Sequence, residues 1–144
     1  MANFIVYILS SLCLLFSASS QNIEKAFLQN NPKILYSQFS SKSHINISLP
    51  EPISFSDQLS NQQAYFLFKK IFNSFSTFEF YSERQSLSSE QETYIFKARW
   101  SFKNKKNNNQ YVFHIFFFLL KENDQKHGNL WKITEIKAEK IWIF

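Results

Sequence analysis

The most conspicuous group of charged side chains in this sequence is basic. Lys97, Arg99 and Lys103 recur at alternate positions, so an extended strand would place them on one face, and Lys105 and Lys106 continue that face into a polar stretch. The formal net charge is +5 and the pI is near 9.3. Such a grouping is typical of a surface that binds anions. The alternative is a solvated strand face without a ligand.

The residues that could carry acid–base chemistry do not form a recognisable site. Asp57 and Asp124 are the only aspartates, and both fall in predicted loops. The glutamates lie on the polar faces or at the ends of predicted strands. An isomerase-like mechanism needs a carboxylate of raised pKa in a dry pocket, together with an acid or oxyanion donor. We therefore expect no catalytic residue and no enzymatic activity.

Metal and nucleotide chemistry also lack their usual patterns. His44, His114 and His127 are far apart, whereas metal sites usually need two ligands at close spacing. The single glycine, Gly128, excludes a phosphate-binding loop and a nucleophile elbow, because each needs several glycines in tight turns. We expect no metal and no cofactor.

The N-terminal segment has the pattern of an export signal. Residues 4–16 form an apolar run interrupted only by two serines, which is too short for a typical membrane span and right for the core of a signal peptide. Ala18 and Ser20 supply small residues before Gln21. We expect residues 1–20 to be a signal peptide, cleaved near Ser20–Gln21, with an uncleaved anchor as the alternative, and residues 21–144 to be one exported domain, periplasmic or secreted. The only cysteine, Cys13, would leave with the signal.

Helical periodicity marks two parts of the exported domain. Residues 22–39 show helical spacing, with Pro32 expected to kink or split the helix. Ser60 and Gln63 match a capping box at the start of a second helix. The apolar stripe of that helix comprises Ala64, Leu67, Phe68, Ile71, Phe72 and Phe75.

The remaining segments favour strands. Residues 44–49 form a short strand that ends at Pro50, and beyond residue 76 the apolar period becomes two. Phe78 and Phe80 alternate with polar neighbours, residues 104–109 form a polar hairpin loop, and a second polar turn spans residues 122–129. A change of parity after Ile133 predicts a bulge in the last strand. Helices followed by strands with short turns predict an α+β domain whose curled antiparallel sheet packs on the helices.

The apolar pattern also predicts the register of the central hairpin. The predicted core face carries Tyr94, Phe96, Ala98, Trp100, Phe102, Phe113, Ile115, Phe117 and Leu119. The opposite face, which we call the outer face, then carries Val112, His114, Phe116, Phe118 and Leu120 beside Lys97 and Arg99. A face this apolar needs a cover, which could be a second subunit or the first helix, and we predict a homodimer or another protein partner.

The order of these elements resembles the nuclear transport factor 2-like superfamily of cone-shaped α+β domains, related in shape to cystatin. It is most similar to a secreted bacterial family known as domain of unknown function 4783. The resemblance rests on Ile45-x-Ile47-x-Leu49, Gln63-Ala64, Ile71-Phe72-x-x-Phe75, residues 94–102 and Trp131-x-Ile133-x-x-Ile136. It implies the cone fold and export, and no established activity.

These observations favour an exported, non-enzymatic binding or protein-interaction domain. One alternative is a small-molecule binder, or an isomerase- or dehydratase-like enzyme, that uses the aromatic cone. The other is a surface protein that binds an anionic glycan or lipid head group through the basic stripe, the name we give to Lys97, Arg99, Lys103, Lys105 and Lys106. Nucleic acid is not an expected partner of an exported protein, and the mature chain carries no predicted transmembrane span. A pocket between the helix from residue 61 onward and the sheet would distinguish the first alternative.

Overall fold

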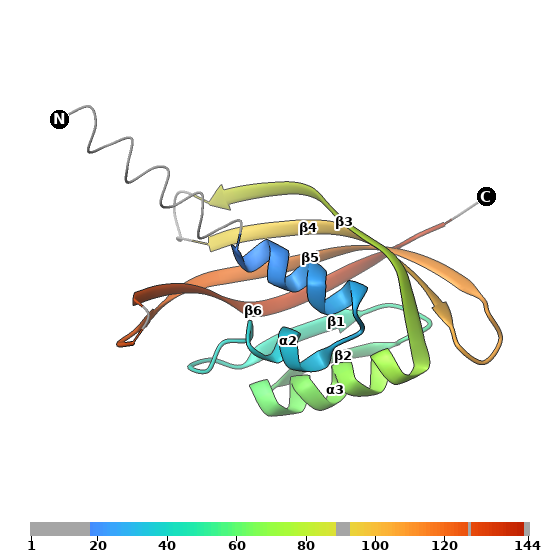
Figure 1. Cartoon of the computed structure of the whole chain (residues 1–144), viewed down its shortest axis with the longest axis horizontal. Helices are drawn as coiled ribbons and strands as arrows, with labels where there is room; N and C mark the ends of the chain where they lie inside the picture. Colours follow the sequence, from blue (N-terminus) through green and yellow to red (C-terminus); the bar gives the residue numbers. More distant parts are fainter. Residues whose placement is uncertain (1–17, 89–92, 127, 143–144) are drawn as a thin grey trace.

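A curled six-stranded sheet with helices against one face forms the domain in a computed structural model that describes residues 18–88, 93–126 and 128–142 (Figure 1). The strands are β1 (Ile45–Leu49), β2 (Phe55–Leu59), β3 (Phe75–Ser88), β4 (Thr93–Asn104), β5 (Gln110–Asp124) and β6 (Gly128–Ile141), in the order β2-β1-β6-β5-β4-β3. All neighbours are antiparallel except β1 and β6, which are parallel. The predicted α+β cone is confirmed, with this one parallel pair inside it.

The N-terminal helical region is split at Pro32, as the sequence predicted. A first helix covers residues 18–28 and ends near Asn30, whose φ of 48° is incompatible with continued helix. Asn31 then caps α2 (Pro32–Tyr36) by accepting from the backbone N–H of Lys33 and Ile34, and Pro32 occupies the first helical position. The expected cleavage position after Ser20 falls in the first turns of the helix at residues 18–28, and the apolar run before it lies outside the described residues.

The longest helix within the described residues, α3 (Asn61–Ser74), begins where the capping box predicts. The Ser60 hydroxyl accepts from the Gln63 backbone N–H, and the Gln63 side chain accepts from the Ser60 N–H. Its predicted apolar stripe is buried except for Leu67, which is half-buried. Phe66 lies off the stripe and is 62% exposed.

Two strand features differ from the sequence prediction. β2 was not predicted, because its Phe-Ser-Asp-Gln-Leu sequence has no apolar alternation, and it lies at the edge of the sheet with its three central residues exposed. Phe78 does not share the core face with Phe80, because it lies at a bulge between Thr77 and Glu79 and is exposed.

The predicted hairpin register is confirmed. Phe96 pairs with Phe117, Ala98 with Ile115 and Trp100 with Phe113, and all six side chains are fully buried. The predicted bulge in the last strand is also present, because Phe118 pairs with Glu135 whereas the next residue, Leu119, pairs with Ile133. The turn between β5 and β6 is shorter than expected, since β5 continues to Asp124 and β6 begins at Gly128.

Candidate functional site

The interior of the cone is filled by aromatic rings. Phe27, from the first helix, is fully buried and has five ring neighbours with centroids 4.7 to 6.0 Å away, namely Phe68, Phe72, Phe80, Trp100 and Phe117. The indole N–H of Trp100 donates to the Thr77 hydroxyl at 2.9 Å, so this buried donor is satisfied. These rings occupy the middle of the space between helices and sheet, where a small-molecule binder or isomerase-like enzyme would need its pocket, and a cleft of about 510 Å³ remains beside the C-terminal half of α3.

The buried polar side chains of the described residues do not supply an acid–base pair. They are four serines: Ser19, Ser20, Ser40 and Ser101. Tyr94 is the buried phenol on the core face, 3% exposed, with its ring 6.0 Å from that of Trp131. Burial raises the pKa of Tyr94 to about 12, so its hydroxyl is protonated at neutral pH. In the part of the chain that the structure describes, no group of three His, Cys, Asp or Glu residues could hold a metal ion.

The outer face carries the five residues that the hairpin register places there. Phe116 pairs with Lys97 on β4 and Lys137 on β6, and Phe118 pairs with Ile95 and Glu135. Val112 is buried, His114, Phe116 and Phe118 are half-buried, and Leu120 is 37% exposed. The face is therefore less apolar than its aromatic sequence suggests, because charged neighbours cover part of the rings.

Two cations of the basic stripe on the outer face are paired with glutamates of β3. Lys97 Nζ lies 3.4 Å from a Glu83 oxygen, and Arg99 Nε lies 3.7 Å from a Glu79 oxygen. Glu83 also lies 3.1 Å from His114 Nε2. A bulge between Ser82 and Arg84 leaves Glu83 outside the strand pairing, and its carboxylate reaches both partners. Lys97 lies over the Phe116 ring, 5.4 Å from its centroid.

Of the other three predicted anion-binding residues, Lys103 continues the outer face at the end of β4, whereas Lys105 and Lys106 lie beyond the strand, beside α3. Lys103 is half-buried and pairs with Ser76 and Gln110. Lys105 Nζ donates to the Phe72 carbonyl near the C-terminal end of α3 at 3.0 Å. Lys105 and Lys106 line a cleft of about 510 Å³ beside α3. The structure therefore does not bring the five basic residues together on one surface.

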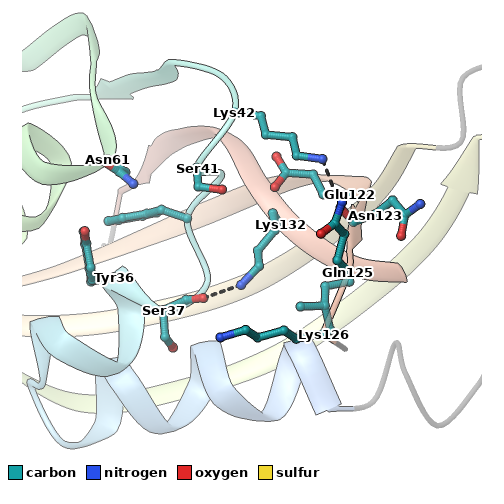
Figure 2. Close-up of a pocket in the computed structure, with 12 residues that line it drawn as sticks. Tyr36, Ser37, Ser41, Lys42, Asn61, Glu122, Asn123, Gln125, Lys126 and Lys132 are labelled. Carbon is teal, nitrogen blue, oxygen red and sulfur yellow. Dashed lines mark hydrogen bonds between the residues drawn. The ribbon is translucent and has the colours of Figure 1, made fainter. Parts of the chain in front are cut away.

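A larger cleft, which we call the lysine cleft, lies where the β5–β6 hairpin meets the segment between α2 and β1 (Figure 2). Its volume is about 780 Å³. The residues that line it are Tyr36, Ser37, Phe39, Ser41, Lys42, Asn61, Glu122, Asn123, Gln125, Lys126, Leu130 and Lys132. Among the described residues that line it, three are lysines and one, Glu122, is a carboxylate. Sequence reasoning missed this site, because its lysines are spread over 90 positions and show no local spacing.

The walls of the lysine cleft are fixed by the turn that follows α2. The Ser40 hydroxyl is bonded to the Glu122 carboxylate and also accepts from the backbone N–H of Lys42 and Ser43. Ser40 N–H donates to the Ile133 carbonyl at 2.9 Å, and Ile133 N–H donates to the Gln38 carbonyl at 2.7 Å. This turn is therefore attached to both strands of the β5–β6 hairpin.

Comparison with solved structures identifies the fold. A domain-of-unknown-function 4783 protein from Bacteroides ovatus superposes with a TM-score of 0.63 at 17% identity, over 85% of this chain and 94% of that one. A ketosteroid isomerase-like protein from Erwinia carotovora atroseptica gives 0.66 at 10% identity, over 90% and 96% of the two chains. A protein assigned as a calcium/calmodulin-dependent kinase II association domain from Exiguobacterium sibiricum gives 0.62 at 10% identity, over 91% and 94%.

These similarities extend over nearly the whole chain at low identity, so they bear on fold. Nuclear transport factor 2-like proteins are among the similar structures, and this chain has their α+β cone fold. No family model and no curated protein sequence matches it. Among the described residues, no helix has both the length and the apolarity to cross a membrane.

Proposed function

We propose that this chain, which has the nuclear transport factor 2-like fold, is an exported, non-enzymatic binding domain. One observation carries the non-enzymatic part. The space that an isomerase-like enzyme of this fold would use for its substrate is filled by Phe27 and its five ring neighbours. Export rests on the apolar run at residues 4–16 and the small residues up to Ser20.

The partner surface in this proposal is the outer face, and its occupant is a second copy of the chain. Phe116 and Phe118 lie at the middle of the sheet, half-buried among lysines and glutamates, and the described helices all pack on the opposite face. An aromatic centre with a charged rim is the usual composition of a protein interface. The association domain named among the similar structures supports assembly as a use of this fold.

Sedimentation velocity of the protein purified from the periplasm of an expressing bacterium tests the interface. We expect a dimer at micromolar concentration, and a monomer for the double variant Phe116→Asn/Phe118→Asn. Phe66→Asn is the matched control, because it also removes an exposed phenylalanine, on α3, and should leave the dimer intact. Far-UV circular dichroism shows whether each variant is folded.

Two results would contradict this interface. The first is a wild-type protein that stays monomeric up to the highest concentration, with no bound peptide or lipid in native mass spectrometry. The second is loss of the dimer in the folded Phe66→Asn variant but not in the outer-face variant. The same mass measurement tests export, since a chain that begins at Gln21 is the expected product.

A further inference from the structure

The lysine cleft has one cationic end. Lys42 Nζ donates to the Asn123 carbonyl at 3.0 Å, and Lys132 Nζ donates to the Ser37 carbonyl at 2.7 Å. An ammonium group has three N–H donors, so each of these lysines keeps donors for a ligand while its position is fixed. Lys126 lies on the same side (Figure 2). The one carboxylate among the described lining residues, Glu122, is bonded to Ser40 and helps to fix the wall.

The opposite end of the cleft is aromatic and polar. Figure 2 shows Tyr36 and Asn61 together at this end, away from the lysines. Tyr36 is 38% exposed, and its ring is held edge-on against Tyr65 with centroids 5.5 Å apart. An exposed ring face next to an amide presents an apolar surface and hydrogen-bonding groups within one site.

The lining favours a ligand that is rich in hydroxyl groups over one that is apolar. Amides, hydroxyls and ammonium groups dominate the 12 residues that line it. The apolar side chains among them are Phe39 and Leu130, and Phe39 is only 3% exposed, so much of the apolar surface of the cleft belongs to the carbon stems and rings of polar side chains, which also suit the C–H faces of a sugar.

We propose that the lysine cleft binds an acidic oligosaccharide, with a sugar ring on Tyr36 and carboxylate or sulfate groups at Lys42 and Lys132. The C–H face of a pyranose ring packs on an exposed aromatic ring, and its hydroxyls match Asn61 and the amides of the hairpin. The acidic groups take the remaining ammonium donors through charge-assisted hydrogen bonds. This site is separate from the outer face, so either surface can fail its test while the other stands.

The binding test uses tetragalacturonate as the acidic probe and isothermal titration calorimetry on the exported protein. We expect binding that weakens as salt rises, with neutral cellotetraose at least about tenfold weaker. Lys42→Gln/Lys132→Gln should lower the affinity about tenfold to a hundredfold. Tyr36→Ala should lower it about tenfold, by removing the stacking surface.

The control variant removes the same number of positive charges outside the lysine cleft. Lys69→Gln/Lys70→Gln changes two exposed lysines on α3, outside both proposed surfaces, and should leave the affinity within about twofold. Thermal melts separate loss of binding from loss of fold. The proposal fails if tetragalacturonate does not bind, or if the control loses as much affinity as the cleft variant. It also fails if hexa-aspartate, or vesicles of phosphatidylglycerol, bind the cleft as tightly as the acidic sugar does.

Discussion

Replacing Phe27 by alanine should be among the most damaging single changes in this protein. The side chain is fully buried, and its ring is surrounded by five others that come from α3, β3, β4 and β5. Removing a buried phenylalanine side chain costs about 3 to 5 kcal/mol of unfolding free energy, as lost transfer energy plus the cavity that remains. The neighbouring rings are held by a sheet and a long helix, which cannot all move inward to fill the cavity. We therefore expect Phe27→Ala to lower the free energy of unfolding by about 4 kcal/mol.

Two further variants make the measurement interpretable. Domains of this size are stable by about 5 to 15 kcal/mol, so Phe27→Ala can remove most of the stability of the native state. Phe27→Leu keeps an apolar side chain there and should cost less than about 1.5 kcal/mol. Phe66→Ala is the control for the loss of an exposed ring and should change stability by less than about 0.5 kcal/mol. Chemical denaturation followed by tryptophan fluorescence reports all three, with an unchanged slope against denaturant.

The outcome decides whether the cone is a packed core. Phe27→Ala should open an apolar cavity that binds benzene, and the wild-type protein should not bind it. A cost below about 1 kcal/mol for Phe27→Ala would refute the reasoning, because it would mean that the interior is loosely packed. Binding of a small apolar ligand inside the wild-type cone would refute it as well, and would favour the alternative of a small-molecule binder or enzyme that uses the aromatic cone.

Two other predictions concern the titration of a buried phenol and the start of α3. The pKa of Tyr94 is raised from 10.0 to about 12, so its phenol ionises at lower pH in the unfolded chain than in the folded one. Wild-type stability should therefore fall as pH rises from 10 to 12, by at most about 1.4 kcal/mol per pH unit. Tyr94→Phe should flatten this part of the pH profile in denaturation at pH 9 to 11.5, and parallel profiles would show that the shift is absent. Ser60→Ala removes the acceptor for the Gln63 N–H and should cost about 1 kcal/mol in thermal unfolding. Gln63→Ala leaves that bond in place and should cost less, so an equal loss in the two variants would contradict the capping account.

Much of the fold could be predicted because its signals are local or nearly so. The capping box at Ser60 depends on residues three positions apart, and the β4–β5 register depends on two alternating runs joined by one short loop. The bulge near Ile133 was visible as a change of parity within one strand. In contrast, β2 carries no such signal, because its central residues face solvent at the edge of the sheet and its sequence is polar.

The candidate sites were harder to predict, because they depend on partners far away in the chain. The sequence identified Lys97 and Arg99 as neighbours on one face, but not that a bulge at Glu83 would bring a carboxylate from β3 against Lys97 and His114. Counting cations along one strand therefore overestimated the charge of that surface.

The sequence by itself determined the helix and strand periods, the aromatic core face and the absence of glycine-dependent chemistry, because each of these depends on residue types at short spacing. Only the tertiary structure decided that the cone interior is filled and that a cleft opens elsewhere. The lysine cleft brings Tyr36, Lys42 and Lys132 together. The turn after α2 is held against the sheet by the Ser40–Glu122 bond and by backbone bonds to Ile133. Contacts between residues some 80 to 95 positions apart exist only after the sheet has assembled, so no local pattern records them.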